Sequence, residues 1–369
     1  DIYRYALQGG RWRLYRIFLW LGLGFLTKGP VAVFFPLLVS GLFFVSRGEW
    51  RRWLAAVFHP GGLAIFVAIV LPWHVAVYLD SGWTFFEGFY LHHNVGRYAD
   101  PMEGHGGSLF YYVLVAPLVV LPFSGWFVRL CGRLGGAWWQ DPLERFLWLW
   151  FLTVLVFFSF SGTKLPHYLL YGISPVFVLL ARHRSLTMPA WLAFGLPLLV
   201  FVLAAALPQI FNVLAAQSTR AHEQLLFAAG AARFDLLYQI LAVGLALLAA
   251  GIAWRVRPVW RALLLVGVLQ AVALNALILP RVFDVLFEPL RSAALIAREA
   301  GASVVRYRVH EPSFSVYRGA PTPAAVPQPD DWVLLKTANL ADFRARYPAR
   351  LDEVRFQGGP ITLLGPVAP

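Results

Sequence analysis

The chain has 369 residues, of which 59% are hydrophobic and only 14% are charged, and its mean hydropathy is +0.64. Soluble globular proteins have about 45–50% apolar and about 25% charged residues, so this composition excludes an ordinary soluble enzyme and a disordered chain. The single cysteine, Cys131, excludes an intramolecular disulfide framework and a cysteine-cluster metal site. The net charge of +12 comes from basic residues scattered between apolar runs, which is typical of membrane-protein loops and not of a nucleic-acid-binding surface.

Apolar runs of membrane-spanning length follow one another through the first 280 residues. A helix that crosses the roughly 30 Å hydrocarbon core needs about 20 mostly apolar residues. The region 14–46 would be about 50 Å long as one helix, and Lys28, Gly29 and Pro30 interrupt it. We therefore expect two short crossings there, although the first is short enough to be re-entrant. These two crossings and seven further apolar runs make nine predicted crossings. The seven runs are 62–79, 108–128, 146–160, 167–181, 188–207, 236–254 and 259–280.

The connections between these runs alternate in charge. One set carries fifteen arginines, whereas the other carries five basic residues. Because Lys and Arg collect in cytoplasmic loops, the arginine-rich set is predicted to be cytoplasmic. The core then lies in the inner membrane of a Gram-negative cell, and everything after about residue 280 lies in the periplasm. The five basic residues on the predicted outer side are Lys28, Arg97, Lys164, Arg220 and Arg233.

Residues 281–369 contain no run that could cross a bilayer. Short alternating apolar segments at 304–309 and 332–335 predict strands, and a helical pattern lies near 289–300. The predicted fold class is therefore mostly α. It consists of a polytopic transmembrane helical bundle, residues 1–280, and a small C-terminal periplasmic α/β domain, residues 281–369.

Three predicted outer turns each present a cation. Lys28 interrupts an apolar region, where an ionisable group is costly and usually functional. Arg97 lies in the long polar loop 80–107, and Lys164 lies in the loop after the run 146–160. Arg grips phosphate oxygens with a planar fork and Lys offers a point charge, so these turns predict a site for the phosphate of a polyisoprenyl-phosphate. The alternative for each cation taken singly is contact with water or lipid headgroups.

Histidines accompany two of these cations. His92 and His93 are adjacent, so on a helix they point about 100° apart and cannot readily share one ion. A divalent cation at His93 is one interpretation, but the spacing follows no zinc pattern. A hydrogen bond from a neutral His to a phosphate or sugar oxygen is the commoner role. Residues that would complete a cation site are Glu87, Glu103 and His105.

His167 and Tyr168 directly follow the Lys164 turn. They either belong to the same site or cap the next crossing, because Tyr is favoured at the membrane interface. The sequence contains no Ser-His-Asp order, P-loop or dinucleotide glycine fingerprint. An enzyme with an outward-facing site and no nucleotide site must use a sugar donor carried by a lipid.

Five segments, in order along the chain, resemble motifs of the bacterial aminoarabinose–lipid A transferases and of the related protein mannosyltransferases, which are C-type membrane glycosyltransferases. The first is LGLGFLTKGP, which contains Lys28, and the second is HNVGRY, which contains His93 and Arg97. The third, GGSLFYY, resembles the motif at which those proteins re-enter the membrane, and the fourth is SGTKLPHYLL. The five segments are 21–30, 93–98, 106–112, 161–170 and 307–317.

This resemblance implies a many-span fold with a C-terminal periplasmic domain. It implies transfer of a sugar from an undecaprenyl-phosphate or other polyprenyl-phosphate donor to lipid A, a glycan or a protein, by inverting displacement. It also implies that Lys28, Arg97 and the loop from Lys164 to Tyr168, with His167, hold the donor phosphate, and that His93 lies at the headgroup pocket. The secondary candidates are Glu103, His105 and Tyr317.

The family's acidic residue that activates or orients the acceptor lies in its first outer loop, and no segment of this chain matches that loop. The chain opens with Asp1 and has no initiator Met or leader, so we expect the N-terminal part to be missing and this stretch to be inactive alone. No catalytic base is assigned. Two alternatives stay open: a transporter or flippase for a lipid-linked sugar, which predicts charge pairs within the spans, and an O-antigen-ligase-type enzyme.

Overall fold

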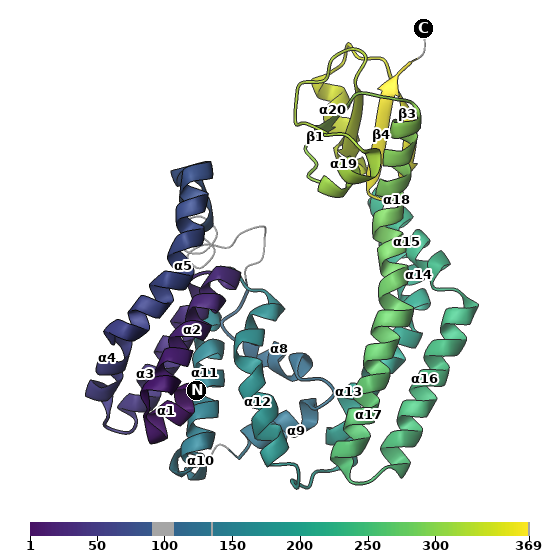
Figure 1. Ribbon diagram of the computed structural model, residues 1–369. Coiled ribbons are helices and arrows are strands. Elements are labelled where there is room, and N and C mark those ends of the chain that lie inside the picture. The colour runs from purple at the N-terminus through teal and green to yellow at the C-terminus, as the bar shows by residue number, and fades with distance from the viewer. Residues whose placement is uncertain (91–106, 134–135, 368–369) are drawn as a thin grey trace. The chain divides into compact units, whose positions relative to one another are not determined.

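The computed structural model describes residues 1–90, 107–133 and 136–367, and it is mostly helical (Figure 1). The chain divides into two compact units, Asp1–Leu196 and Pro197–Pro369, called unit 1 and unit 2. Unit 1 is helical throughout its described residues, whereas unit 2 combines helices with a small C-terminal sheet.

Four helical stretches of the described residues have the length and apolar character to cross a membrane. A fifth is formed if α13 (Ala190–Ala205) and α14 (Leu207–Gln217), which are bent by 62° at their junction, count as one span. Only 6% of α5 is buried inside the protein, which suits a helix surrounded by lipid. The four stretches are α5 (Pro60–Ser81), α11 (Pro142–Ser159), α16 (Leu236–Arg255) and the continuous stretch Val259–Glu299.

The helices of unit 1 correspond to the first predicted apolar runs. The run 108–128 is broken into two shorter helices, and the run 167–181 begins with a 3-10 turn. Besides α5, α11 and the first part of α13, which the boundary between the units divides, the elements are α1 (Ile2–Gln8), α2 (Arg11–Lys28), α3 (Val31–Val45), α4 (Trp50–Val57), α6 (Trp83–Phe86), α8 (Tyr111–Val119), α9 (Ser124–Cys131), α10 (Ala137–Gln140), η2 (Pro166–Leu169) and α12 (Leu170–Arg182).

The predicted break at residues 28–30 is present. Helix α2 ends at Lys28, and Gly29 follows with φ +75°, a conformation that glycine adopts without strain. The N–H of Gly29 donates to the carbonyl of Phe25, which closes the last turn, and Pro30 precedes α3. Helix α3 has 15 residues and is therefore about 22 Å long.

Local sequence also explains where α11 begins. Asp141 precedes Pro142, the first helical residue, and its carboxylate accepts hydrogen bonds from the N–H groups of Leu143 and Glu144 at 2.8 and 3.0 Å. These bonds satisfy two donors that have no partner inside the helix. The N–H of Glu144, more than any other neighbour, holds the pKa of Asp141 below its ordinary value, and Arg182 adds to this effect.

Aromatic rings align α3 with α11 and α12. The Phe35 ring lies 5.3 and 5.4 Å from the rings of Phe157 and Phe158, and 5.7 Å from that of Tyr171. Phe35 is in the first turns of α3, whereas Phe157 and Phe158 are in the last turn of α11. The turn at Lys28 and the loop after α11 consequently lie at the same end of unit 1.

The opposite end of unit 1 is rich in arginine. Arg145, at the start of α11, donates to the carbonyl of Ser46, just after α3, at 3.3 Å. Arg52 donates to the carbonyls of Tyr5 and Ala6 at 2.8 and 2.9 Å, which attaches α4 to α1. These bonds hold together turns that the charge pattern assigned to one side of the membrane.

Unit 2 departs from two expectations. The connection after residue 207, expected as a loop with Arg220 and Arg233, is a helical hairpin, because the ring of Phe211 packs against Phe227 and against Gly230, which has no side chain. The helix expected near 289–300 is also not separate from the run 259–280. A π-helical turn precedes Pro280, and the helix continues past this proline. The helices are α15 (Ala221–Arg233), α17 (Val259–Val272), η3 (Ala273–Ile278) and α18 (Leu279–Glu299).

The predicted small α/β region is present at the C-terminal end of unit 2. Its four-stranded sheet has the order β1-β2-β4-β3, with β1 and β2 parallel and the other pairs antiparallel. Helix α18 and Phe314 cover one face, and Phe343 covers the other. The elements are β1 (Val304–Tyr307), α19 (Pro312–Arg318), β2 (Trp332–Lys336), η4 (Thr337–Asn339), α20 (Leu340–Arg346), β3 (Asp352–Gly358) and β4 (Ile361–Pro366).

Candidate functional site

Lys164 is buried at the end of α11, with an exposed fraction of 6%. Its ammonium donates hydrogen bonds to the carbonyls of Ser159 and Ser161 at 2.9 and 2.6 Å. Carbonyl groups at a helix C-terminus have no partner inside the helix and carry the negative end of its dipole, so they stabilise a buried cation. Because an ammonium has three donors, one N–H of Lys164 has no acceptor among the residues that the structure describes.

Tyr112 of α8 fastens the Lys164 loop. Its hydroxyl donates to the carbonyl of Leu165 at 3.1 Å and accepts from the N–H of Leu165 at 3.0 Å. The residue is fully buried. Gly107, five residues before Tyr112, lies close to the side chain of Lys164. A Cβ atom placed on Gly107 would be 3.1 Å from Cδ of Lys164. The C-terminal end of the polar loop 80–107 thus lies against Lys164.

The start of the expected loop 80–107 is helical through Tyr90, and this helical part lies against the Lys28 turn. A Cβ placed on Gly29 would lie 3.0 Å from Cε1 of Phe89. The ring of Tyr90 is stacked with that of Phe25, which lies three residues before Lys28, with the centroids 6.1 Å apart. Lys28 itself is exposed.

The described residues on either side of 91–106 therefore lie against the two lysine turns. The candidates within this segment lie outside the described residues, and so does the metal ligand proposed from the sequence, His93. In the described ranges, no group of three or more His, Cys, Asp or Glu side chains could hold a metal ion. The candidates that lie in residues 91–106 are His93, Arg97, Glu103 and His105.

The remaining candidates are divided between the two units. His167 is exposed, and its ring lies 4.9 Å from that of Tyr168. Tyr168 is half-buried against Phe158, with ring centroids 4.7 Å apart, so both residues directly border the Lys164 loop. Tyr317 is an exposed residue of α19 in unit 2.

His74 is a polar residue that the sequence analysis did not single out. Its Nδ1 lies 2.8 Å from the carbonyl of Val70, so Nδ1 carries the hydrogen, and its Nε2 accepts a hydrogen bond from the Tyr90 hydroxyl at 2.5 Å. The signal was available, since an ionisable side chain inside the run 62–79 is rare without a role. His74 thus connects α5 to the π-helical turn 87–90.

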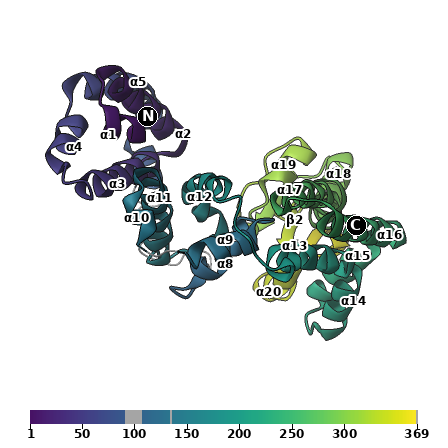
Figure 2. The same cartoon turned by 90° about the horizontal axis from the view of Figure 1, so that it is seen from below.

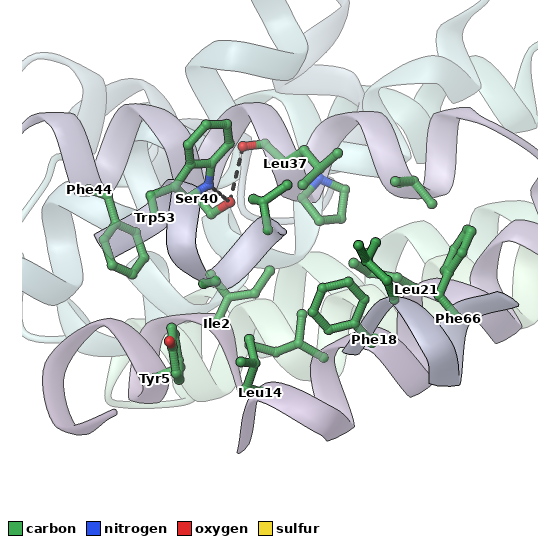
Figure 3. A pocket seen from close by; sticks show the side chains of 16 residues that line it. Ile2, Tyr5, Leu14, Phe18, Leu21, Leu37, Ser40, Phe44, Trp53 and Phe66 are labelled. Atoms are coloured by element: carbon green, nitrogen blue, oxygen red, sulfur yellow. Dashed lines mark hydrogen bonds between the residues drawn. The ribbon is translucent and has the colours of Figure 1, made fainter. Parts of the chain in front are cut away.

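A separate apolar cavity of about 150 Å³ lies among helices α1 to α5, which group together in Figure 2. Figure 3 shows Leu14 and Phe18 on one side and Leu37 on the other. Ser40 accepts a hydrogen bond from Trp53 and donates one to the carbonyl of Leu37, so its hydroxyl is satisfied. No charged side chain lines the cavity, which therefore suits hydrocarbon and not a phosphate.

These features define a class: a multi-pass helical membrane protein whose cationic turns lie at one end of a helical unit, with a small α/β region near its C-terminus. No family model matches the chain. It is 34% identical over 190 residues to the undecaprenyl phosphate-α-4-amino-4-deoxy-L-arabinose arabinosyl transferase of Pseudomonas paraeruginosa, a match that covers 48% of this chain and 33% of the relative. The transferase of the same name from Pseudomonas aeruginosa is 34% identical over 191 residues, with the same coverage of both chains.

The chain thus matches about a third of the length of these curated relatives. In structure, all of it is similar to 73% of ArnT from Cupriavidus metallidurans, solved bound to undecaprenyl phosphate, with a TM-score of 0.70 and 17% identity. That likeness shows a shared fold. The resemblance to the aminoarabinose transferases, drawn from the five motifs, is confirmed by these relatives and by this fold.

Proposed function

We propose that this protein acts as a membrane glycosyltransferase that moves a sugar from a polyprenyl-phosphate carrier to an acceptor outside the cytoplasm, with lipid A favoured over a glycan or a protein. The observation that carries the proposal is that the described residues on either side of 91–106 lie against the two lysine turns, Phe89 against Gly29 and Gly107 against Lys164. The similarity to transferases that use undecaprenyl phosphate as the carrier supports it.

The proposed reaction is a single displacement. An acceptor oxygen bonds to the anomeric carbon while the bond from that carbon to the phosphate oxygen breaks, with inversion. Negative charge develops on the departing phosphate, so cations fixed beside it stabilise the transition state more than the ground state. Lys164, with one N–H that has no acceptor among the described residues, Lys28 and Arg97 would supply this charge, and His93 would contact the headgroup. A phosphate acceptor is already anionic, so this step assigns no general base among the described residues.

The proposed topology has nine crossings in the inner membrane of a Gram-negative cell. The end with Lys28 and Lys164 faces the periplasm, and residues 281–369 form a periplasmic domain. Two observations support this orientation: basic residues collect in cytoplasmic loops, and the arginine-rich turns of unit 1 contact one another at the end opposite to Lys28.

The direct test is binding of undecaprenyl phosphate to the full chain in detergent, measured by native mass spectrometry. We expect Lys28→Met and Lys164→Met each to weaken binding by roughly 2–5 kcal/mol, because each removes a charge partner of the phosphate. Lys336→Met is the matched control, since Lys336 is the third and last lysine of the chain and lies at the end of β2. It should bind as the wild type does.

Undecaprenol, which lacks the phosphate, should bind much more weakly than undecaprenyl phosphate. Equal affinity for the two lipids, or wild-type affinity in both lysine variants with unchanged melting temperatures, would refute the donor site.

A further inference from the structure

A cavity of about 660 Å³ opens in the α/β region of unit 2. It lies between the end of β1, helix α19 and the segment 319–323 that follows it. Sites for small molecules have volumes of about 300–1,000 Å³, so this cavity is large enough for a ligand bigger than a single ion. Its lining combines the polar side chains of Arg306, His310 and Ser315 with apolar walls, which include Leu334.

Arg306 presents an unused face of its guanidinium group. Nη1 donates hydrogen bonds to Nδ1 of His310 at 2.5 Å and to the carbonyl of Val309 at 3.4 Å. Nε is buried and has no hydrogen-bond partner, and Nη2 makes no hydrogen bond to any residue in the described ranges. The Nε and Nη2 edge is the planar fork with which arginine holds two oxygens of a phosphate or carboxylate. A buried N–H without an acceptor is unfavourable, so turning of the guanidinium toward a bound anion would relieve it.

Neighbouring groups add donors around this fork. Because Nδ1 of His310 accepts from Arg306, the hydrogen of a neutral His310 is on Nε2, and His310 is exposed. Arg318 donates to the carbonyl of Pro321 at 3.0 Å and to the Thr322 hydroxyl at 3.3 Å, which fixes the wall of the cavity. The hydroxyl hydrogen of Thr322 therefore stays available to donate.

The rest of the lining suits a sugar. Glu311 is the one carboxylate that lines the cavity, and its oxygens accept hydrogen bonds from hydroxyl groups while repelling a second anion. Pro312 and Val316 offer apolar surface for the C–H face of a ring. An inorganic phosphate would fill only a fraction of the volume.

We propose that this cavity, the Arg306 pocket, binds a phosphorylated sugar, with the phosphate on the Nε and Nη2 fork of Arg306 and the sugar hydroxyls toward Ser315 and Glu311. The pocket shares no residue with the proposed donor site, so it does not depend on that proposal. The same chemistry occurs in a free sugar phosphate and in the headgroup of a phosphorylated glycolipid.

The test is isothermal titration of the full chain in detergent with glucose 1-phosphate. Arg306→Gln should weaken binding about tenfold or more, because it removes the charged fork. Arg308→Gln is the matched control: it removes the same charge two residues away, but Arg308 pairs with Asp342 at 2.9 Å and does not line the pocket. Ser315→Ala, a small change on the pocket wall, should weaken binding with an unchanged melting temperature. This variant keeps the test valid if Arg306→Gln unfolds.

Four comparisons decide the outcome. Glucose or inorganic phosphate binding as tightly as glucose 1-phosphate would overturn the proposal, and so would equal losses in Arg306→Gln and Arg308→Gln. Lys164→Met should retain wild-type affinity for glucose 1-phosphate, which separates this pocket from the donor site. Displacement of glucose 1-phosphate by lipid A would identify the ligand as a lipid headgroup, and absence of displacement would identify it as a free sugar phosphate.

Discussion

Gly107 lies beside the side chain of Lys164, so close that a Cβ atom added to Gly107 would be only 3.1 Å from Cδ of Lys164. The contact connects two parts of the chain that are 57 residues apart, the end of the polar loop and the turn after α11. The ammonium of the same side chain is held by the carbonyls of Ser159 and Ser161. A side chain at position 107 would therefore displace the aliphatic part of a buried cation whose end is fixed.

Replacing Gly107 should disturb Lys164. In Gly107→Ala the new methyl group must push Cδ of Lys164 aside by a few tenths of an ångström, and overpacking of this kind costs about 1 kcal/mol or more. We expect binding of undecaprenyl phosphate to weaken about fivefold. Gly195→Ala, at a helical position with no atom within 4 Å of the new Cβ, is the control and should bind normally. Wild-type affinity in Gly107→Ala would show that the Lys164 position does not matter for binding.

The hydroxyl of Tyr112 should contribute to stability. Tyr112→Phe leaves the N–H of Leu165 without its acceptor, which costs about 1–3 kcal/mol for a buried group, whereas the carbonyl of Leu165 keeps its hydrogen bond from the N–H of Tyr168 at 3.0 Å. We expect a lower apparent melting temperature in detergent. Tyr111→Phe is the neighbouring control, because the Tyr111 hydroxyl has no hydrogen bond to a residue in the described part of the chain. If the two variants have the same melting temperature, the hydrogen bond to Leu165 does not contribute to stability.

Asp141, which caps the N-terminus of α11, should make the stability of the protein depend on pH in the acidic range. Backbone N–H groups hold the pKa of Asp141 below its ordinary value of about 3.9, so the folded protein favours the ionised carboxylate. The resulting stabilisation is complete above pH about 4 and is lost as pH falls through the lowered pKa. Asp141→Asn keeps an acceptor but has no charge, so its deficit in melting temperature relative to wild type should shrink on acidification. A deficit that stays constant down to pH 3 would contradict this cause.

The hydrogen bond between His74 and Tyr90 can be measured by a double-mutant cycle. Because it joins two neutral groups, we expect a coupling of about 0.5–1.5 kcal/mol between His74→Phe and Tyr90→Phe. The measurement is the apparent stability of the wild type, the two single variants and the double variant in detergent. Additive losses would mean that the two side chains do not interact in the membrane-embedded protein.

The sequence predicted much of the helical layout, and specific residues explain why. Gly29 and Pro30 mark the break between α2 and α3, and short apolar alternation marks β1 and β2. The helical hairpin of α14 and α15 was missed, because it depends on the packing of Phe211 against Gly230, which are 19 residues apart. The continuation of the helix past Pro280 was missed for a similar reason, since a π-helical turn removes the stop that proline signals in a single sequence.

The order of apolar runs, the charge alternation of the connections and the identity of the lysine turns are properties of neighbouring residues, so the sequence alone determined them. Which carbonyls hold the ammonium of Lys164, which glycine presses against it, and which edge of Arg306 stays unpaired were decided only by the tertiary structure. The physical reason is that burial and hydrogen-bond partners come from segments distant along the chain, and hydropathy and spacing describe only what is adjacent.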